Sequence, residues 1–127
     1  MYTVKEIIPY EFTRDIIFQD SSGKEIKVFD DTDLLGDNDF SFLKPGKKYD
    51  CSIGILGNIN NDGEIFQIGK KKRIGAVSFI ELIDSNNNKF YLEPDNQKLD
   101  TTELYVKLEV ERYDLLQVNK VINSRFK

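Results

Sequence analysis

Apolar and polar residues alternate strictly along residues 103–113. One face carries the aliphatic side chains of Leu104, Val106, Leu108 and Val110. The opposite face carries Tyr105, Lys107, Glu109, Glu111 and Tyr113. A repeat of two residues is typical of a β-strand that buries one face. The segment therefore predicts a half-buried strand.

Turn signals divide much of the chain into short β-rich segments. Residues 16–19 and 25–29 predict the arms of a hairpin, because Gly23 in the connection between them can take a positive φ. A second hairpin is expected to turn at residues 84–88. Residues 2–10 predict a further strand, with Pro9 at its end because proline lacks an N–H group.

The middle and the tail of the chain carry weaker signals. Residues 48–59 predict a strand that contains Gly54 and Gly57, and glycine in a strand indicates a bulge, a bend or a close backbone. Asn61-Asp62-Gly63 predicts the turn of another hairpin. In the tail, Leu115, Val118 and Ile122 share one helical face, which predicts a short C-terminal helix.

These segments favour an all-β, mainly antiparallel fold, since no strand is followed by a clear crossover helix. We expect one domain over residues 1–127, arranged as a partly open barrel or a small sandwich with at most one or two short helices.

The order of segments resembles an OB-fold. A bulged first strand would run through residues 2–19, and a hairpin would lead into residues 24–29. The stretch "FLKPGKKYDCSIGILG" would supply a turn and a curved third strand, and the C-terminal half would supply two more strands. The chain departs from the usual pattern by lacking a distinct helix between the third and fourth strands. The resemblance implies a small barrel that binds single-stranded nucleic acid.

Composition excludes several classes of chemistry. The chain has no histidine and one cysteine, Cys51, so it lacks a Ser-His or Cys-His nucleophile and an internal disulfide. We expect no catalytic residues, no metal and no cofactor. The missing disulfide and the absence of a signal-like start favour the cytoplasm, and no apolar run is long enough to span a bilayer.

The chain has a net charge of -4 but contains four consecutive cations: Lys70, Lys71, Lys72 and Arg73. One interpretation is a nucleic-acid site, with the nearby rings of Phe66 and Phe79 as stacking partners. The favoured interpretation is a solvated hairpin tip that blocks edge pairing, with both rings in the core.

Residues 30–39 hold five aspartates and no cation: Asp30, Asp31, Asp33, Asp37 and Asp39. They fit an exposed loop whose aspartates cap turns, a contact with a basic protein surface, or a divalent cation. For the protein contact, Leu34 and Leu35 would form the desolvated centre. Phe40 and Phe42 are predicted to pack this loop onto the barrel.

We therefore expect a non-enzymatic cytoplasmic protein-binding domain, in the narrower form an immunity or antitoxin-like inhibitor of a basic partner. The alternative function is an OB-fold-like protein that binds single-stranded nucleic acid through Lys70, Lys71, Lys72 and Arg73.

Overall fold

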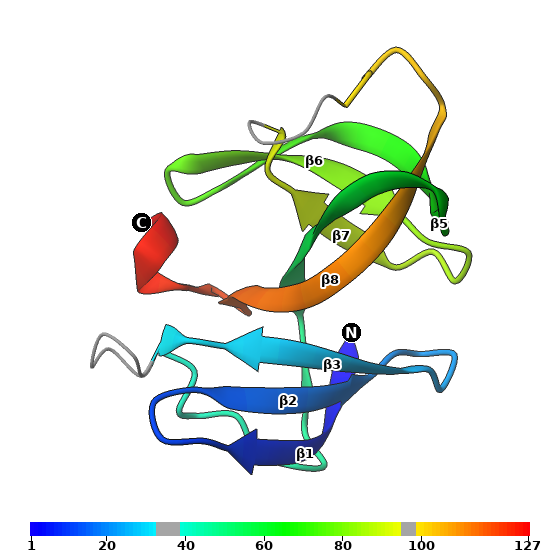
Figure 1. Ribbon diagram of the computed structural model, residues 1–127. Coiled ribbons are helices and arrows are strands. Elements are labelled where there is room, and N and C mark those ends of the chain that lie inside the picture. Colours follow the sequence, from blue (N-terminus) through cyan, green and yellow to red (C-terminus); the bar gives the residue numbers. More distant parts are fainter. Residues whose placement is uncertain (33–38, 95–98) are drawn as a thin grey trace.

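The computed structural model describes residues 1–32, 39–94 and 99–127 (Figure 1). Within these residues nine strands form one sheet, so the predicted all-β, mainly antiparallel fold is confirmed. The strands are β1 (Tyr2–Pro9), β2 (Arg14–Gln19), β3 (Glu25–Asp30), β4 (Lys48–Tyr49), β5 (Cys51–Ile74), β6 (Val77–Ile83), β7 (Lys89–Leu92), β8 (Tyr105–Val118) and β9 (Val121–Ile122). A single 3-10 turn, η3 (Ser124–Phe126), is the helical element near the C-terminus.

The strand order is β4-β1-β2-β3-β8-β5-β6-β7, with β9 beside β8. The β3–β8 and β5–β7 pairings are parallel and short, whereas the other pairings are antiparallel. The sheet is not closed into a barrel. Only Asp50 separates β4 from β5, so the segment that pairs with β1 continues directly into the strand that pairs with β8.

Two of the three predicted hairpins are present. Gly23 turns β2 into β3 with φ of 92°, and Asn87 has φ of 63° between β6 and β7. The predicted first strand over residues 2–19 is instead two paired strands, β1 and β2, and β1 is bulged between Val4 and Glu6. Pro9 is the last residue of β1, as expected.

The predicted turn at Asn61-Asp62-Gly63 is wrong. The chain keeps its direction through this point: β5 is 24 residues long, and its residues 51–67 lie along β8. The register shifts there, so that Ile59 and Glu64 both lie opposite Leu108. A Cβ on Gly63 would overlap the Leu108 backbone, so the glycine serves a bulge that packs against β8.

The predicted C-terminal helix is also wrong. Leu115 and Val118 belong to β8, where they pair with Ile53 and Cys51 of β5 and lie in the core. Asn119, with φ of 53°, then turns the chain into β9. Pairing with a long neighbouring strand therefore overrides the weak helical periodicity of this segment.

Buried side chains form two clusters. The larger one includes Phe18, Phe66 and Phe90. Most of its buried residues come from β1, β2, β3, β5, β6, β7 and β8. The smaller one joins the β6–β7 hairpin and the C-terminus, and comprises Ile74, Phe79, Tyr91, Leu116 and Phe126. Phe66 and Phe79 are 0% and 3% exposed, so the prediction that both are core residues is confirmed.

Candidate functional site

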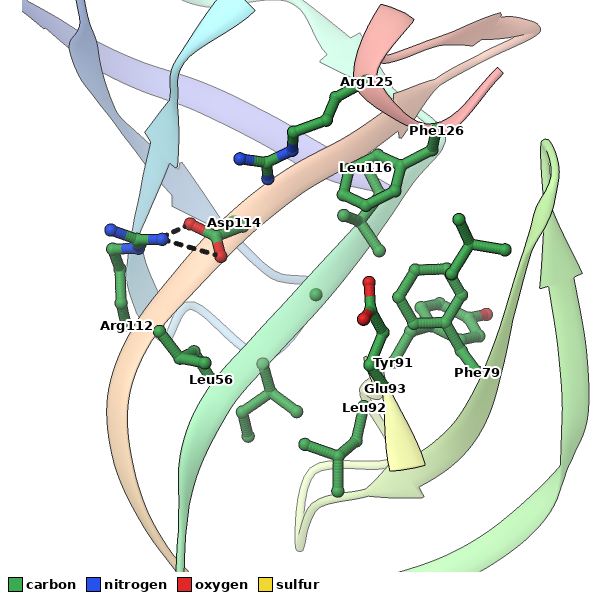
Figure 2. A pocket seen from close by; sticks show the side chains of 13 residues that line it. Leu56, Phe79, Tyr91, Leu92, Glu93, Arg112, Asp114, Leu116, Arg125 and Phe126 are labelled. Carbon is green, nitrogen blue, oxygen red and sulfur yellow. Dashed lines mark hydrogen bonds and ion pairs between the residues drawn. The ribbon is translucent and has the colours of Figure 1, made fainter. Parts of the chain in front are cut away.

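A cleft of about 420 Å³ lies above the smaller cluster (Figure 2). Its apolar side is formed by residues of four elements: Leu56 of β5, Phe79 of β6, Tyr91 of β7 and Leu116 of β8. Phe126 of η3 completes this side. Because strands and a docked tail supply the walls, the cleft is set in the sheet and not in a loop.

Close backbone contacts bring these walls together. The Ala76 N–H donates to the carbonyl of Phe126 at 2.6 Å, which fixes the C-terminus to the β5–β6 turn. Gly75 has φ of 59° there, and a Cβ would overlap the same carbonyl. Across the cleft, a Cβ on Gly54 would lie 3.1 Å from the side chain of Leu116. Glycine at both positions lets the tail and β8 approach β5.

Two arginines also line the cleft, and both are paired. Arg112 donates to Asp114 through Nε at 2.7 Å and through Nη2 at 3.3 Å. Arg125 donates through Nη1 to Asp31 at 2.6 Å. Its guanidinium also lies over the ring of Phe126, 4.8 Å from the centroid. Both cations of the cleft are therefore neutralised within the fold.

Asp114 is a half-buried carboxylate of the cleft. Burial raises its pKa above the ordinary value, and the hydrogen bonds and charge of Arg112 oppose that rise. Burial of its own hydroxyl, together with the charges of Glu81 and Asp50, raises the pKa of Tyr91. The Asp114 side chain is 16% exposed, so water screens electrostatic contacts with it less than contacts with a fully exposed carboxylate.

Glu93 is the remaining charged residue of the lining. It follows β7 directly, and Figure 2 shows its carboxylate pointing into the cleft on the side of Phe79 and Tyr91. Among the described residues, no hydrogen-bond donor or cation pairs with this carboxylate.

The predicted acidic loop is only partly within the described residues. Asp33, Leu34, Leu35 and Asp37 lie outside them. The other three aspartates make internal contacts. Asp30 is 2% exposed and pairs with Arg14 at 2.8 Å. Asp31 binds Arg125, and Asp39 accepts from the N–H and the hydroxyl of Ser124 at 2.7 Å and 2.6 Å. These three carboxylates therefore hold the C-terminal tail and β2 in place.

The two rings of this loop differ. Phe40 is fully buried, as expected, and its carbonyl accepts a hydrogen bond from Arg14. Phe42 is 37% exposed and packs edge-on against Tyr49.

The basic run does not form a hairpin tip, which corrects that part of the favoured interpretation. Lys70, Lys71, Lys72 and Arg73 lie inside β5, and the turn follows at Gly75. Lys71 lies opposite Ile80 and Lys72 opposite Phe79, so alternation sends neighbouring cations to different faces. Of the described strands, only β6 pairs with residues 71–74, and lysines along the other edge disfavour strand addition.

Other groups with potential chemistry are isolated. Burial raises the pKa of the Cys51 thiol to about 12. The described residues contain no cluster of three or more acidic, cysteine or histidine side chains placed to hold a metal ion. No helix in the described ranges is long and apolar enough to cross a membrane.

Sequence reasoning missed the cleft because its walls come from five separate elements. One signal was present: Gly54 was expected to mark a bulge, a bend or a close backbone, and the group that lies close to it is the side chain of Leu116. Comparison of the chain with protein-family models, curated proteins and solved structures found no match.

Proposed function

We propose that this chain is a non-enzymatic, cytoplasmic protein-binding domain and that the cleft between β5, β6, β7, β8 and η3 is its binding site. The observation that carries the proposal is the combination of an apolar wall with a polar rim on rigid strands. Protein interfaces are commonly centred on such a partly desolvated pocket that receives an anchor side chain. Leu56, which is 43% exposed, lies on this surface.

The narrower form of the proposal is an inhibitor of the immunity or antitoxin type that neutralises a basic partner. The acidic chain supports this form, since opposite charge speeds encounter and orients the partner. Asp30, Asp31 and Asp39 already have partners inside the fold, so we place the centre of the interface at the cleft and not at the acidic loop.

A matched pair of β5 variants tests the position of the interface. Leu56→Asp places a charge in the cleft, whereas Ile65→Asp places the same charge at a 54% exposed position outside its lining. Immobilised wild type and each variant are compared for retention of proteins from source cells, with quantitative mass spectrometry as the readout.

We expect a partner that wild type and Ile65→Asp retain and Leu56→Asp loses. Loss of the partner with Ile65→Asp and its retention with Leu56→Asp would move the interface to the paired ends of β5 and β8 around Ile65 and Tyr105, which we call the β5–β8 arm. Absence of any specifically retained protein would count against a protein-binding role.

A second candidate rests on the order of the strands. β1, β2, β3, β8 and β5 are neighbours in that order, and β4 returns the start of β5 to β1. This order supports an OB-like core, and hence binding of single-stranded nucleic acid. We rank it second because Lys71 and Lys72 lie on different faces. Fluorescence anisotropy with labelled oligonucleotides at low salt tests it: tight binding lost on Lys70, Lys71 and Lys72→Ala substitution would reverse the ranking.

A further inference from the structure

We infer that the cleft receives a basic side chain of the partner and that Glu93 binds its charged head. This inference rests on the proposed protein-binding function and adds the chemistry of the side chain that is recognised. It follows from the charges that line the cleft, from the apolar wall and from the negative net charge of the whole chain.

Among the described residues, one carboxylate that lines the cleft has no partner of opposite charge. Arg112 is neutralised by Asp114, and Arg125 by Asp31. Glu93 points into the same space and has no partner among the described residues (Figure 2). A ligand with a positive head therefore gains an ion pair there, whereas an anionic ligand meets an uncompensated carboxylate.

The apolar wall matches the rest of a basic side chain. Lysine and arginine have a long aliphatic stem below the charged head and bury that stem along apolar surface. Leu56 and Val77 offer such surface in the lining of the cleft, as do the rings of Phe79 and Tyr91. A volume of about 420 Å³ accommodates one long side chain with its solvent.

Arg125 provides an internal precedent for this chemistry. It already rests on the ring of Phe126 while its head binds the carboxylate of Asp31. A partner's side chain would repeat that arrangement on the opposite side of the cleft. The net charge of -4 also favours the approach of a basic partner from solution.

The test uses n-butylammonium, which reproduces the stem and head of lysine and does not require the partner. Butyrate and n-butanol have a similar alkyl chain with a negative or a neutral head. Each compound is titrated into the labelled full chain at constant ionic strength, and amide chemical shifts are followed by NMR. Glu93→Gln removes the proposed charge, and Glu11→Gln makes the same change at an exposed residue of the β1–β2 connection.

We expect saturable shifts around residues 54–56, 91–93 and 114–116 with n-butylammonium alone. Glu93→Gln should weaken this binding by about fivefold, the order expected for a partly exposed charge pair, and Glu11→Gln should leave it unchanged. Equal shifts with n-butanol, preference for butyrate, unchanged binding by Glu93→Gln, or no shifts in the cleft would each overturn the inference. The capture experiment with Leu56→Asp would be unaffected by such a result. Failure of this inference can therefore be distinguished from failure of the proposed function.

Discussion

Two β-hairpin turns that are distant in sequence share one amide, and its removal should destabilise the fold. The Asn88 side chain donates to Asp20 Oδ2 at 2.6 Å and more weakly to Asp84 Oδ2 at 3.4 Å. Asp20 closes the β2–β3 turn and Asp84 closes the β6–β7 turn, and both are buried. Asn88→Ala removes the donor but keeps the backbone N–H that binds Asp84.

The magnitude follows from the loss of one charge-assisted hydrogen bond. Such bonds contribute about 1.5–3 kcal/mol, and the nearby solvent places this one at the lower end. We therefore expect Asn88→Ala to lower the free energy of unfolding by about 1.5 kcal/mol near neutral pH. Asn86→Ala is the matched control, because that side chain is exposed in the same turn. Urea unfolding followed by circular dichroism measures both.

The loss should also depend on pH. Burial raises the pKa of Asp20, but hydrogen bonds from the Ser22 hydroxyl, Asn88 and the backbone outweigh it and lower the pKa to about 2. A carboxyl whose pKa is lowered on folding stabilises the protein above its unfolded pKa of about 3.9, and this stabilisation is lost as the pH falls toward 2. The difference between wild type and Asn88→Ala should narrow over that interval. A stability equal to that of Asn86→Ala, or a difference that widens on acidification, would refute the reasoning.

Three further predictions concern packing and the thiol. Gly57→Ala should destabilise the fold by about 2 kcal/mol in urea unfolding, since a Cβ would overlap the carbonyl of Glu109 in β8. Phe126→Ala should cost about 3 kcal/mol and raise amide exchange at Gly75 and Ala76, because the ring is 7% exposed in the smaller core cluster. Cys51, with a pKa of about 12 caused first by burial, should resist a disulfide reagent near neutral pH and react once the chain is unfolded. Near-wild-type stability of Gly57→Ala would contradict the first prediction, and unchanged amide exchange in Phe126→Ala the second. Rapid reaction of the thiol in the native protein would contradict the third.

The sequence predicted those parts of the fold that depend on local signals. Gly23 and the alternation of Val106 and Leu108 define a hairpin and a half-buried strand within a few residues, and both are present. Two predictions failed where distant segments decide the outcome. Gly63 resembles a hairpin glycine, but its role depends on Leu108 of another strand. Leu115 resembles a helical residue, but it pairs with Ile53.

The candidate site was harder to predict for the same reason. Glu93 has no motif around it, and the role that we propose for it depends on the pairing of Arg112 and Arg125 with other residues. Asp31 illustrates the converse: as part of an acidic run it suggested a binding surface, whereas in the fold it fixes the C-terminal tail through Arg125. The pairing of Asp31 with Arg125, which are distant in sequence, thus helps to determine which charges of the cleft are paired within the fold.

The most direct test of the central claim is hydrogen–deuterium exchange of the whole chain, alone and bound to the partner captured by wild type. The account predicts that the partner slows exchange at residues 54–56, 77–79, 91–93 and 112–116, which line the cleft. Protection confined to the β5–β8 arm around Ile65 and Tyr105, or to the described part of the acidic loop, with the cleft unchanged, would contradict it.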